Sequence, residues 1–372
     1  MEIYPIKITK PFKNNEVEIF HIENFGTSYG VEIDNDNNIY IPSFSDGYIF
    51  KVRNDLKKTS VLKIKNGKLE NISFFEKFFF KSRLNKKINF YKGSFLRPHD
   101  IIFDKNNNML ITQMGLSYGG GLGKVDIVSN DMTLKKTLGL EMHNGKGMIS
   151  PVMTNINDGL FYVTEFGADK ILRFDENYQF IDWIGRIGEK NLDIENNSWS
   201  ESKNFINISL KQPHAIKLGP DNNFYLVDSE NHRIIKFDNN GELIGWIGKR
   251  DNNTLNYDWS NDGNSIKGEE LGAFNVPIDL FFYKEFMYVS DCRNNRIVKL
   301  DLSGKSISWF GDTESENFSK NIWKNEEFNS ILSNSYFGLN NPYGIRIKND
   351  TIYIADKNNF RIKIVKFIKN LN

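Results

Sequence analysis

The chain has 372 residues, and its 48 Lys and Arg nearly balance its 47 Asp and Glu. A chain this close to neutrality has no overall electrostatic field for nucleic acid or an anionic membrane, so any such partner has to be recognised locally. The 30 Phe, 15 Tyr and 6 Trp supply enough large apolar side chains for a substantial core.

The single cysteine, Cys292, excludes an internal disulfide framework and any CxxC-type zinc or redox site. The first twenty residues contain no apolar core of the kind that a secretory signal needs. No window approaches the ~20 apolar residues of a transmembrane segment. These features predict a soluble, cytoplasmic protein.

The first predicted element is a strand at residues 16–25 (EVEIFHIENF), where apolar and polar residues alternate. Six repeating units follow, which start near residues 27, 97, 150, 212, 276 and 341. Self-similarity at a fixed period of this size is typical of solenoids and propellers.

Each unit contains short alternating runs such as FYLV (224–227) and IIKF (234–237), separated by Asn, Asp and Gly turns. This pattern predicts strands and hairpins rather than helices, with four antiparallel strands per unit. A four-stranded sheet cannot bury both faces alone, so the units are expected to pack in a ring. The sequence therefore predicts an all-β protein, a single six-bladed β-propeller domain over residues 1–372.

The two ends of the chain are expected to share one blade. The last unit ends after three strands, and residues 16–25 resemble the fourth strands of other units, such as GELIGWIG (241–248). An N-terminal strand that completes the last blade would close the ring and remove exposed sheet edges.

The recurring pattern P-x-G/D-I, then N-x-x-Y-V-x-D-x-x-N-x-R-I-x-K-F, then G-x-x-x-x-x-x-G resembles the NHL repeat, in six copies over residues 25–367. The resemblance implies a six-bladed propeller, a fold that serves both enzymes and binding platforms. An acidic residue followed five positions later by a basic one recurs as Glu165/Lys170, Asp228/Arg233, Asp291/Arg296 and Asp356/Arg361. Such repetition favours ion-paired corners between strands two and three of a blade, with ligand contact as the alternative.

Four connections are long enough to form a rim or lid over one mouth of the central channel: residues 66–94, 186–209, 249–273 and 312–338. In propellers the first strand of each blade lines the channel, and function concentrates in the loops at its mouth.

Two of the five histidines, His99 and His214, occupy the same position in units two and four, where unit six has Tyr343. This arrangement resembles peptidyl-α-hydroxyglycine α-amidating lyase, in which histidines of three alternate blades hold a catalytic zinc. The resemblance implies that His99 and His214 are metal ligands. Three protein ligands and one open position are what a catalytic zinc requires.

The third histidine of that pattern is replaced by Tyr343, whose phenol is a poor zinc ligand unless it loses its proton. Asp100, Asp279 or His143 could complete a zinc site. The tyrosine of the lyase family's blade-three turn is not matched, because the turn here reads TEFGADK, with Phe166 or Gly167 at that place. The alternatives are a metal-free polar pocket and histidines that only cap a turn.

The candidate catalytic residues are therefore His99, His214, Tyr343 and Asp279. The candidate ligand-binding residues are Arg97, Asp100, His143 and Glu165. The predicted function is that of a lyase or hydrolase acting on a small polar substrate or a peptide at the channel mouth.

The alternative is a scaffold that binds a protein or RNA through its loop-rich face. The insert at residues 74–97 combines Phe with Lys and Arg, a composition that suits a lid helix packed on the propeller, an anionic ligand, a membrane surface or RNA. The glycine-rich segment 115–124 lacks the frame of a phosphate-binding loop. Trp183, Trp246 and Trp309 recur at the ends of outer strands, which indicates packing rather than carbohydrate binding.

Overall fold

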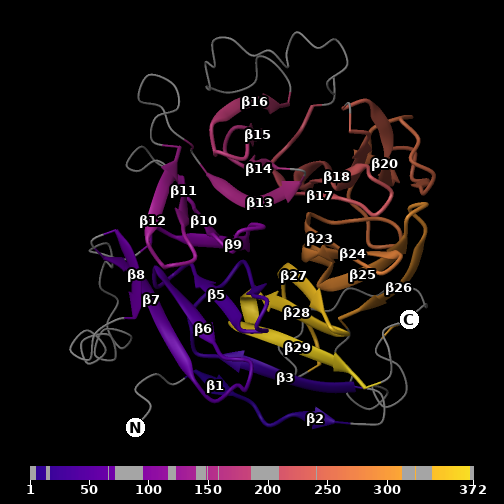
Figure 1. Ribbon diagram of the computed structural model, residues 1–372. Coiled ribbons are helices and arrows are strands. Elements are labelled where there is room, and N and C mark those ends of the chain that lie inside the picture. The colour runs from indigo at the N-terminus through magenta and orange to yellow at the C-terminus, as the bar shows by residue number, and fades with distance from the viewer. Residues whose placement is uncertain are drawn as a thin grey trace.

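The computed structural model describes residues 6–13, 17–65, 67–71, 95–115, 123–139, 148, 150–157, 159–185, 209–239, 241–311, 323 and 337–368. In these residues the regular structure consists of β-strands and three-residue 3-10 turns, with no α-helix. Six antiparallel sheets are arranged around a common axis (Figure 1). The prediction of an all-β, six-bladed propeller is confirmed.

Each blade begins at the axis of the ring and ends at its rim. Blade one contains β4 (Glu32–Ile33), β5 (Ile39–Ser43), β6 (Tyr48–Val52), β7 (Thr59–Lys65) and β8 (Lys68–Asn71). Blade two contains β9 (Pro98–Phe103), β10 (Met109–Gln113), β11 (Lys124–Val128) and β12 (Leu134–Leu138). Blade three contains β13 (Pro151–Asn157), β14 (Leu160–Glu165), β15 (Lys170–Phe174) and β16 (Phe180–Ile184).

The remaining blades follow the same order. Blade four contains β17 (Pro213–Leu218), β18 (Phe224–Asp228), β19 (Arg233–Phe237) and β20 (Leu243–Arg250), extended by β21 (Leu255–Asn256) and β22 (Ser265–Ile266). Blade five contains β23 (Pro277–Tyr283), β24 (Phe286–Asp291), β25 (Arg296–Asp301) and β26 (Ser306–Phe310). Blade six begins with β27 (Pro342–Lys348), β28 (Thr351–Asp356) and β29 (Arg361–Phe367).

The N-terminal strand β3 (Val17–Glu23) completes blade six. It pairs antiparallel with β29 along its whole length, with Glu23 opposite Arg361 and Val17 opposite Phe367. Two short strands, β1 (Lys7–Ile8) and β2 (Phe12–Lys13), pair with the other edge of β3. Figure 1 shows β3 beside β29, so the predicted closure of the ring by the N-terminal strand is confirmed.

Apolar side chains fill the spaces between neighbouring blades. One cluster joins blades four and five through Ala215, Val227, Leu280 and Val289, all of them inaccessible to solvent. Each fully buried side chain of this size contributes roughly 1.5–3 kcal/mol to folding. The alternation of the strands thus places one apolar face of each blade against the next blade.

The acidic and basic residues of the repeat meet as predicted in blades four, five and six. The carboxylate Oδ2 lies 2.7–2.8 Å from the arginine Nε in the pairs Asp228/Arg233, Asp291/Arg296 and Asp356/Arg361. The Oδ1 atom of the same carboxylate accepts a backbone N–H from the segment that leads into the first strand of the blade: Lys211, Asn275 or Asn340. Each carboxylate therefore joins the turn after the second strand to the start of the first.

Neighbouring blades are held together at the same face. The residue before the first-strand proline has a left-handed backbone at Gln212, Val276 and Asn341, with φ of 50°, 52° and 51°. Its N–H donates to a side chain of the preceding blade, which is Asp169, His232 or Asn295 respectively. A left-handed valine is uncommon, so these bonds offset a conformational cost at each blade junction.

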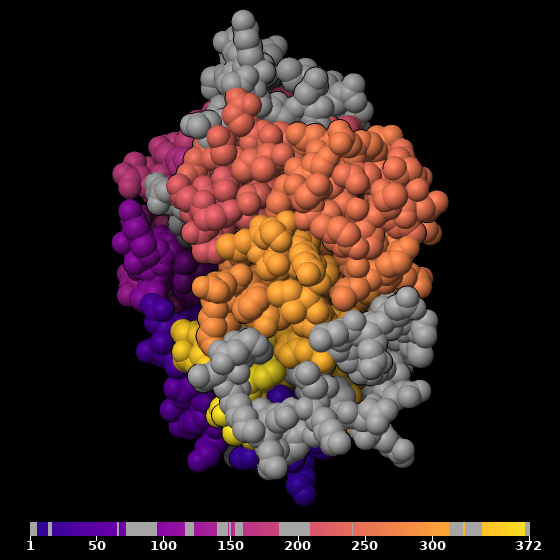
Figure 2. All heavy atoms as spheres, turned by 90° about the vertical axis from the view of Figure 1, so that its right-hand side faces the viewer, coloured from indigo at the N-terminus to yellow at the C-terminus, as the bar shows by residue number. Residues whose placement is uncertain are grey.

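The insert at residues 249–273 packs on the outer strand of blade four and bonds to the corner turns of blades four and five. Its Trp259 packs edge-on against Tyr225, and the indole N–H donates to the carbonyl of Leu302 at 3.1 Å. The chain passes so close to Gly245 of the outer strand β20 that a Cβ atom there would overlap the backbone of Trp259. Around Trp259 the insert therefore lies along the outside of blades four and five, and Figure 2 shows the insert (orange) as part of the surface on that side.

Candidate functional site

The side chains of His99, His214 and Tyr343 meet near the axis of the ring. Each follows the proline that opens β9, β17 or β27, so three alternate blades contribute one ring each. The ring of Tyr343 lies 6.2 Å from that of His99 and 6.0 Å from that of His214, measured between centroids. The structure thus brings together three of the four residues that the sequence suggests for catalysis.

Further aromatic rings surround the two imidazoles. Tyr29 stacks on His99 with centroids 4.7 Å apart and planes inclined by 22°, and it contacts Tyr343 edge-on. Phe166 packs against His214 at 4.9 Å. Tyr29 was missed by sequence reasoning, although TSYG in unit one occupies the place of NPYG in unit six.

Backbone carbonyls set the protonation of each imidazole. His99 donates one ring N–H to the carbonyl of Val152, while its Nδ1 is buried and has no hydrogen-bond partner. Nδ1 of His214 lies 3.1 Å from the carbonyl of Gln212 and 2.9 Å from Oγ of Ser229. A carbonyl only accepts, so the proton of His214 is on Nδ1 and its Nε2 keeps a free lone pair.

Burial keeps both imidazoles neutral. It lowers the pKa of His99 to about 3, with a further contribution from the neighbouring His214. It lowers the pKa of His214 to about 4. At neutral pH the site therefore presents two imidazole lone pairs, one from Nδ1 of His99 and one from Nε2 of His214.

Two cationic side chains lie against the aromatic rings of this cluster, and the carboxylate of Asp279 acts on His214 from a greater distance. The ammonium of Lys357 lies 4.8 Å from the ring centroids of both Tyr29 and Tyr343, within the range of cation–π attraction. Arg97 lies over the ring of Phe44 at 5.6 Å. Burial raises the pKa of Tyr343 well above its ordinary value, so its phenol remains protonated and can donate a hydrogen bond.

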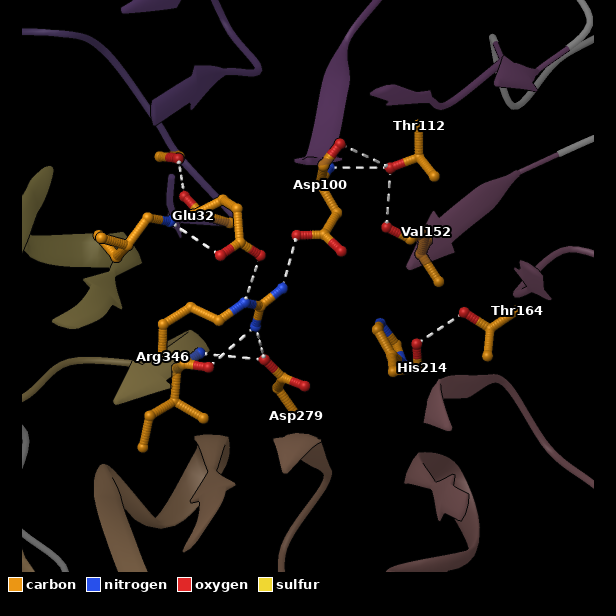
Figure 3. Close-up of polar contacts among 12 residues, drawn as sticks. Glu32, Asp100, Thr112, Val152, Thr164, His214, Asp279 and Arg346 are labelled. Atoms are coloured by element: carbon orange, nitrogen blue, oxygen red, sulfur yellow. Dashed lines mark hydrogen bonds and ion pairs between the residues drawn. The ribbon is translucent and has the colours of Figure 1, made fainter. Parts of the chain in front are cut away.

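Asp279 and Asp100 take part in a different cluster, centred on Arg346 (Figure 3). The guanidinium of Arg346 binds Asp279 Oδ2 at 2.9 Å, Glu32 Oε2 at 2.8 Å and Asp100 Oδ1 at 3.3 Å. Asp279 Oδ2 also accepts the backbone N–H of Ile345. Asp279 is thus committed to Arg346 rather than to the imidazoles.

One carboxylate oxygen of this cluster has no hydrogen-bond partner among the described residues. Asp100 Oδ2 is buried without a partner, and burial raises the pKa of Asp100 to about 6 against the opposing effect of Arg346. Lys217 carries a second positive charge, and burial lowers its pKa. Sequence reasoning missed Glu32, Lys217 and Arg346, although a charged residue within an otherwise apolar first strand, as in GVEI, AIKL and GIRI, was a signal for them.

The candidate ligand-binding residue Glu165 lies elsewhere. Oε1 of Glu165 accepts the backbone N–H groups of Ser150 and Gly167, so its carboxylate supports the turn at the end of β14. The partner of Glu165 in the repeat, Lys170, lies over the ring of Trp183. His143 falls outside the described residues.

The described residues supply only part of a zinc site. Two neutral imidazoles that each donate their other N–H to a backbone carbonyl have the outer-shell arrangement of metal-binding histidines. However, no three His, Cys, Asp or Glu side chains among the residues that the structure describes come together as a metal-binding group. The zinc prediction therefore depends on a further ligand.

Comparison with known proteins identifies the repeat and the fold. The family model for the NHL repeat matches residues 210–237. A catalytically inactive histidine-to-alanine variant of virginiamycin B lyase from Staphylococcus aureus, solved with quinupristin, superposes with a TM-score of 0.52 and 14% sequence identity, covering 95% of this chain and all of that one. No curated protein matches the sequence significantly.

Two further solved structures are similar. An auxiliary nutrient binding protein from Bacteroides thetaiotaomicron has a TM-score of 0.53 and 14% identity, over 92% of this chain and 69% of that one. A putative gluconolactonase has a TM-score of 0.52 and 8% identity, over 95% and 92%. At such identities the similarity establishes the fold alone. In the described part of the chain no helix is long and apolar enough to cross a membrane.

Proposed function

We propose that His99, His214 and Tyr343 bind and transform a small polar substrate in a lyase or hydrolase reaction. The chain is a six-bladed β-propeller with an NHL repeat, and this fold serves many functions, so the activity has to be argued from the site. The observation that carries the proposal is the pair of imidazole lone pairs near the axis of the ring. A buried Nδ1 without a partner is costly unless a ligand donates to it.

The protonation states suggest which residues accept and which donate hydrogen bonds to the substrate. The lone pairs of His99 and His214 accept O–H or N–H groups of the substrate, and the protonated phenol of Tyr343 donates to an oxygen. Lyase and hydrolase reactions both require that one group removes a proton and another returns a proton to the leaving atom. Imidazoles with pKa values of about 3 and 4 are weak bases in the free protein. A bound substrate that carries negative charge would raise both values toward neutrality.

The surroundings favour an anionic or strongly dipolar substrate. Lys357 and Arg97 lie against aromatic rings of the cluster and supply positive charge on its outer side. The propeller enzyme whose histidine-to-alanine variant is catalytically inactive offers an analogy for a catalytic histidine on this fold.

Two matched substitutions test the proposal. The amide of His99→Gln can keep the bond to Val152, and that of His214→Asn can keep the bond to Gln212, while each replaces the basic ring nitrogen with a group that cannot take up a proton. Quinupristin and gluconolactone, taken from the similar propellers, are suitable first substrates. We expect the wild-type protein to turn over at least one of them, and each substitution to reduce kcat/KM by about 100-fold or more.

Arg97→Gln is the control, because Gln212 occupies the equivalent position with the same left-handed backbone. We expect it to change KM more than kcat. Turnover that persists in the folded His99→Gln and His214→Asn variants would contradict the assignment. So would the absence of turnover with both substrates.

Elemental analysis of the purified protein decides whether the reaction depends on a metal. About one equivalent of zinc that is lost in the His99→Gln variant would make the two histidines metal ligands, which supply a Lewis acid and an activated water. Less than about a tenth of an equivalent of zinc per chain would indicate that the reaction does not use a metal.

The second candidate function is a scaffold that binds a protein or RNA. It rests on the basic and aromatic insert at residues 74–97, of which the structure describes only residues 95–97. Steeply salt-dependent RNA binding that disappears when Lys81, Arg83, Lys86 and Lys87 are neutralised would favour this function.

A further inference from the structure

A cavity of about 320 Å³ lies between blade four and the insert at residues 249–273. This volume is at the lower end of the range for small-molecule pockets. Two groups of residues line it. Blade four and the segment before it contribute Ser209, Asn231, Arg233, Leu243 and Trp246, and the insert contributes Asn261, Gly263, Asn264 and Ser265. None of them belongs to the cluster at the ring axis.

Arg233 differs from the arginine at the same corner of blade five. Both bind the corner carboxylate through Nε. In blade five, both terminal nitrogens of Arg296 donate hydrogen bonds to backbone carbonyls, which belong to Glu269, Glu270 and Ala273. The side chain of Arg296 is completely buried. In blade four only Nη2 of Arg233 is used, by the carbonyl of Ser209 at 3.2 Å.

Two residues that line the cavity each have an N–H donor without a hydrogen bond in the part of the chain that the structure describes. Nη1 of Arg233 and Nε1 of Trp246 make no hydrogen bond within the described residues, although the side chain of Arg233 is only 10% exposed and Trp246 is 1% exposed. The guanidinium lies 6.0 Å from the Trp246 ring. Both residues line the same cavity, so a guanidinium N–H and an indole N–H are each available to donate to a carboxylate oxygen.

Asparagine side chains from blade four and from the insert supply acceptors to the cavity. The side-chain amide nitrogens of Asn231 and Asn264 donate to Asp228 and Asp251, which leaves their Oδ1 atoms as acceptors. Asn261 adds an exposed amide. No carboxylate is among the described residues that line the cavity, and Asp228, which binds Nε of Arg233, leaves Nη1 available for a ligand anion.

We propose that the cavity between blade four and the insert binds a small hydroxylated carboxylic acid. The carboxylate lies against Arg233 and Trp246, and the hydroxyls donate to Asn231 and Asn264. Arg233 thus has two roles, because it holds the corner of blade four through Nε and binds the ligand through Nη1.

Titration calorimetry with gluconate as the probe tests this assignment. Sorbitol has the same carbon chain without the carboxylate, and acetate has the carboxylate without the hydroxyls. We expect one gluconate to bind per chain. Sorbitol and acetate should give no heat of binding at about 10 mM, a concentration ten times higher than a Kd of about 1 mM and therefore high enough to detect binding of that strength. Inorganic phosphate at the same concentration serves as the comparison for a simple anion.

Two substitutions locate the binding. Arg233→Lys keeps the positive charge at a corner where blade three itself has Lys170, but it removes the forked donors, so we expect at least 10-fold weaker binding. Asn261→Phe fills the cavity without removing a hydrogen bond within the described residues, and we expect it to abolish binding. Asn106→Phe, a similarly exposed asparagine in blade two, is the matched control and should leave binding unchanged.

Several results would overturn the proposal. They are the absence of gluconate binding, equal binding of sorbitol or phosphate, and binding that Asn261→Phe leaves intact. Binding that depends on His99 would place the ligand at the ring axis, which would also reject the cavity. The cavity and the reaction proposed for the histidines can therefore fail separately.

Discussion

The buried imidazole of His99 makes the folded state sensitive to acid. In the unfolded chain a histidine takes up a proton below a pKa of about 6.5. In the folded protein the pKa of His99 is about 3. Between these values the unfolded state binds one more proton, so acidification lowers the free energy of unfolding by roughly 1.4 kcal/mol per pH unit for this residue. Asp100, with its pKa raised to about 6, acts in the opposite direction below that pH.

His99→Gln should remove the contribution of His99 and leave that of Asp100. We expect the free energy of unfolding of the variant, relative to the wild type, to rise by roughly 1.4 kcal/mol between pH 6 and pH 5. Urea unfolding at pH 7, 6 and 5 measures the difference. Arg97→Gln does not change a group that titrates in this range and should follow the wild type. Parallel pH profiles for His99→Gln and the wild type would show that His99 is not a buried neutral imidazole.

Residue patterns paired the two histidines and named Asp100 and Asp279, but they did not predict the charged cluster that these two carboxylates form with Arg346. His99 and His214 stand at one position of an in-register repeat, so comparing units was sufficient to pair them. Arg346 meets Glu32 and Asp279 from three different blades. That convergence depends on how far each side chain reaches toward the axis, which no spacing along the chain encodes.

Among the elements, the insert at residues 249–273 depends on a single glycine. The chain at Trp259 crosses β20 against Gly245, where no Cβ can be accommodated. Trp259 is 8% exposed and packs against Tyr225, and its indole bonds to Leu302. The close approach of the insert to β20 thus depends on the large side chain of Trp259 and the missing side chain of Gly245, in addition to the pairing of β21 and β22 with β20.

Gly245→Ala should displace the insert from blade four. We expect it to lower the free energy of unfolding by at least about 2 kcal/mol, the range of overpacked cores. Chemical denaturation followed by tryptophan fluorescence measures both the stability and the environment of Trp259. Ile244→Ala, at the neighbouring exposed position, should cost less than about 1 kcal/mol. A Gly245→Ala variant as stable as the wild type would mean that the insert does not pack at this position.

In the whole molecule, the ring is closed by the first and last parts of the chain. The seven residues of β3 pair with β29, and Val17 and Ile19 are buried in the cluster between blades five and six. Without β3, one edge of β29 and one face of that cluster would be exposed.

Deleting residues 1–25 should therefore unfold the protein rather than shorten it. Deleting residues 1–10 removes β1 but keeps β3, and we expect this control to remain folded. Circular dichroism and size-exclusion chromatography distinguish the two outcomes. A soluble, fully folded chain without residues 1–25 would show that the ring does not need this closure.

The sequence by itself determined the number of blades, the closing N-terminal strand and the corner ion pairs of blades four to six. These features are repeated in register, and each depends on contacts within a blade or between adjacent strands. Only the tertiary structure decided the protonation of the two imidazoles, the grouping around Arg346, the position of the insert and the cavity beside Arg233. Each of these depends on which side chains and carbonyls from separate blades approach one another in space, and the spacing of residues along a strand does not specify those distances.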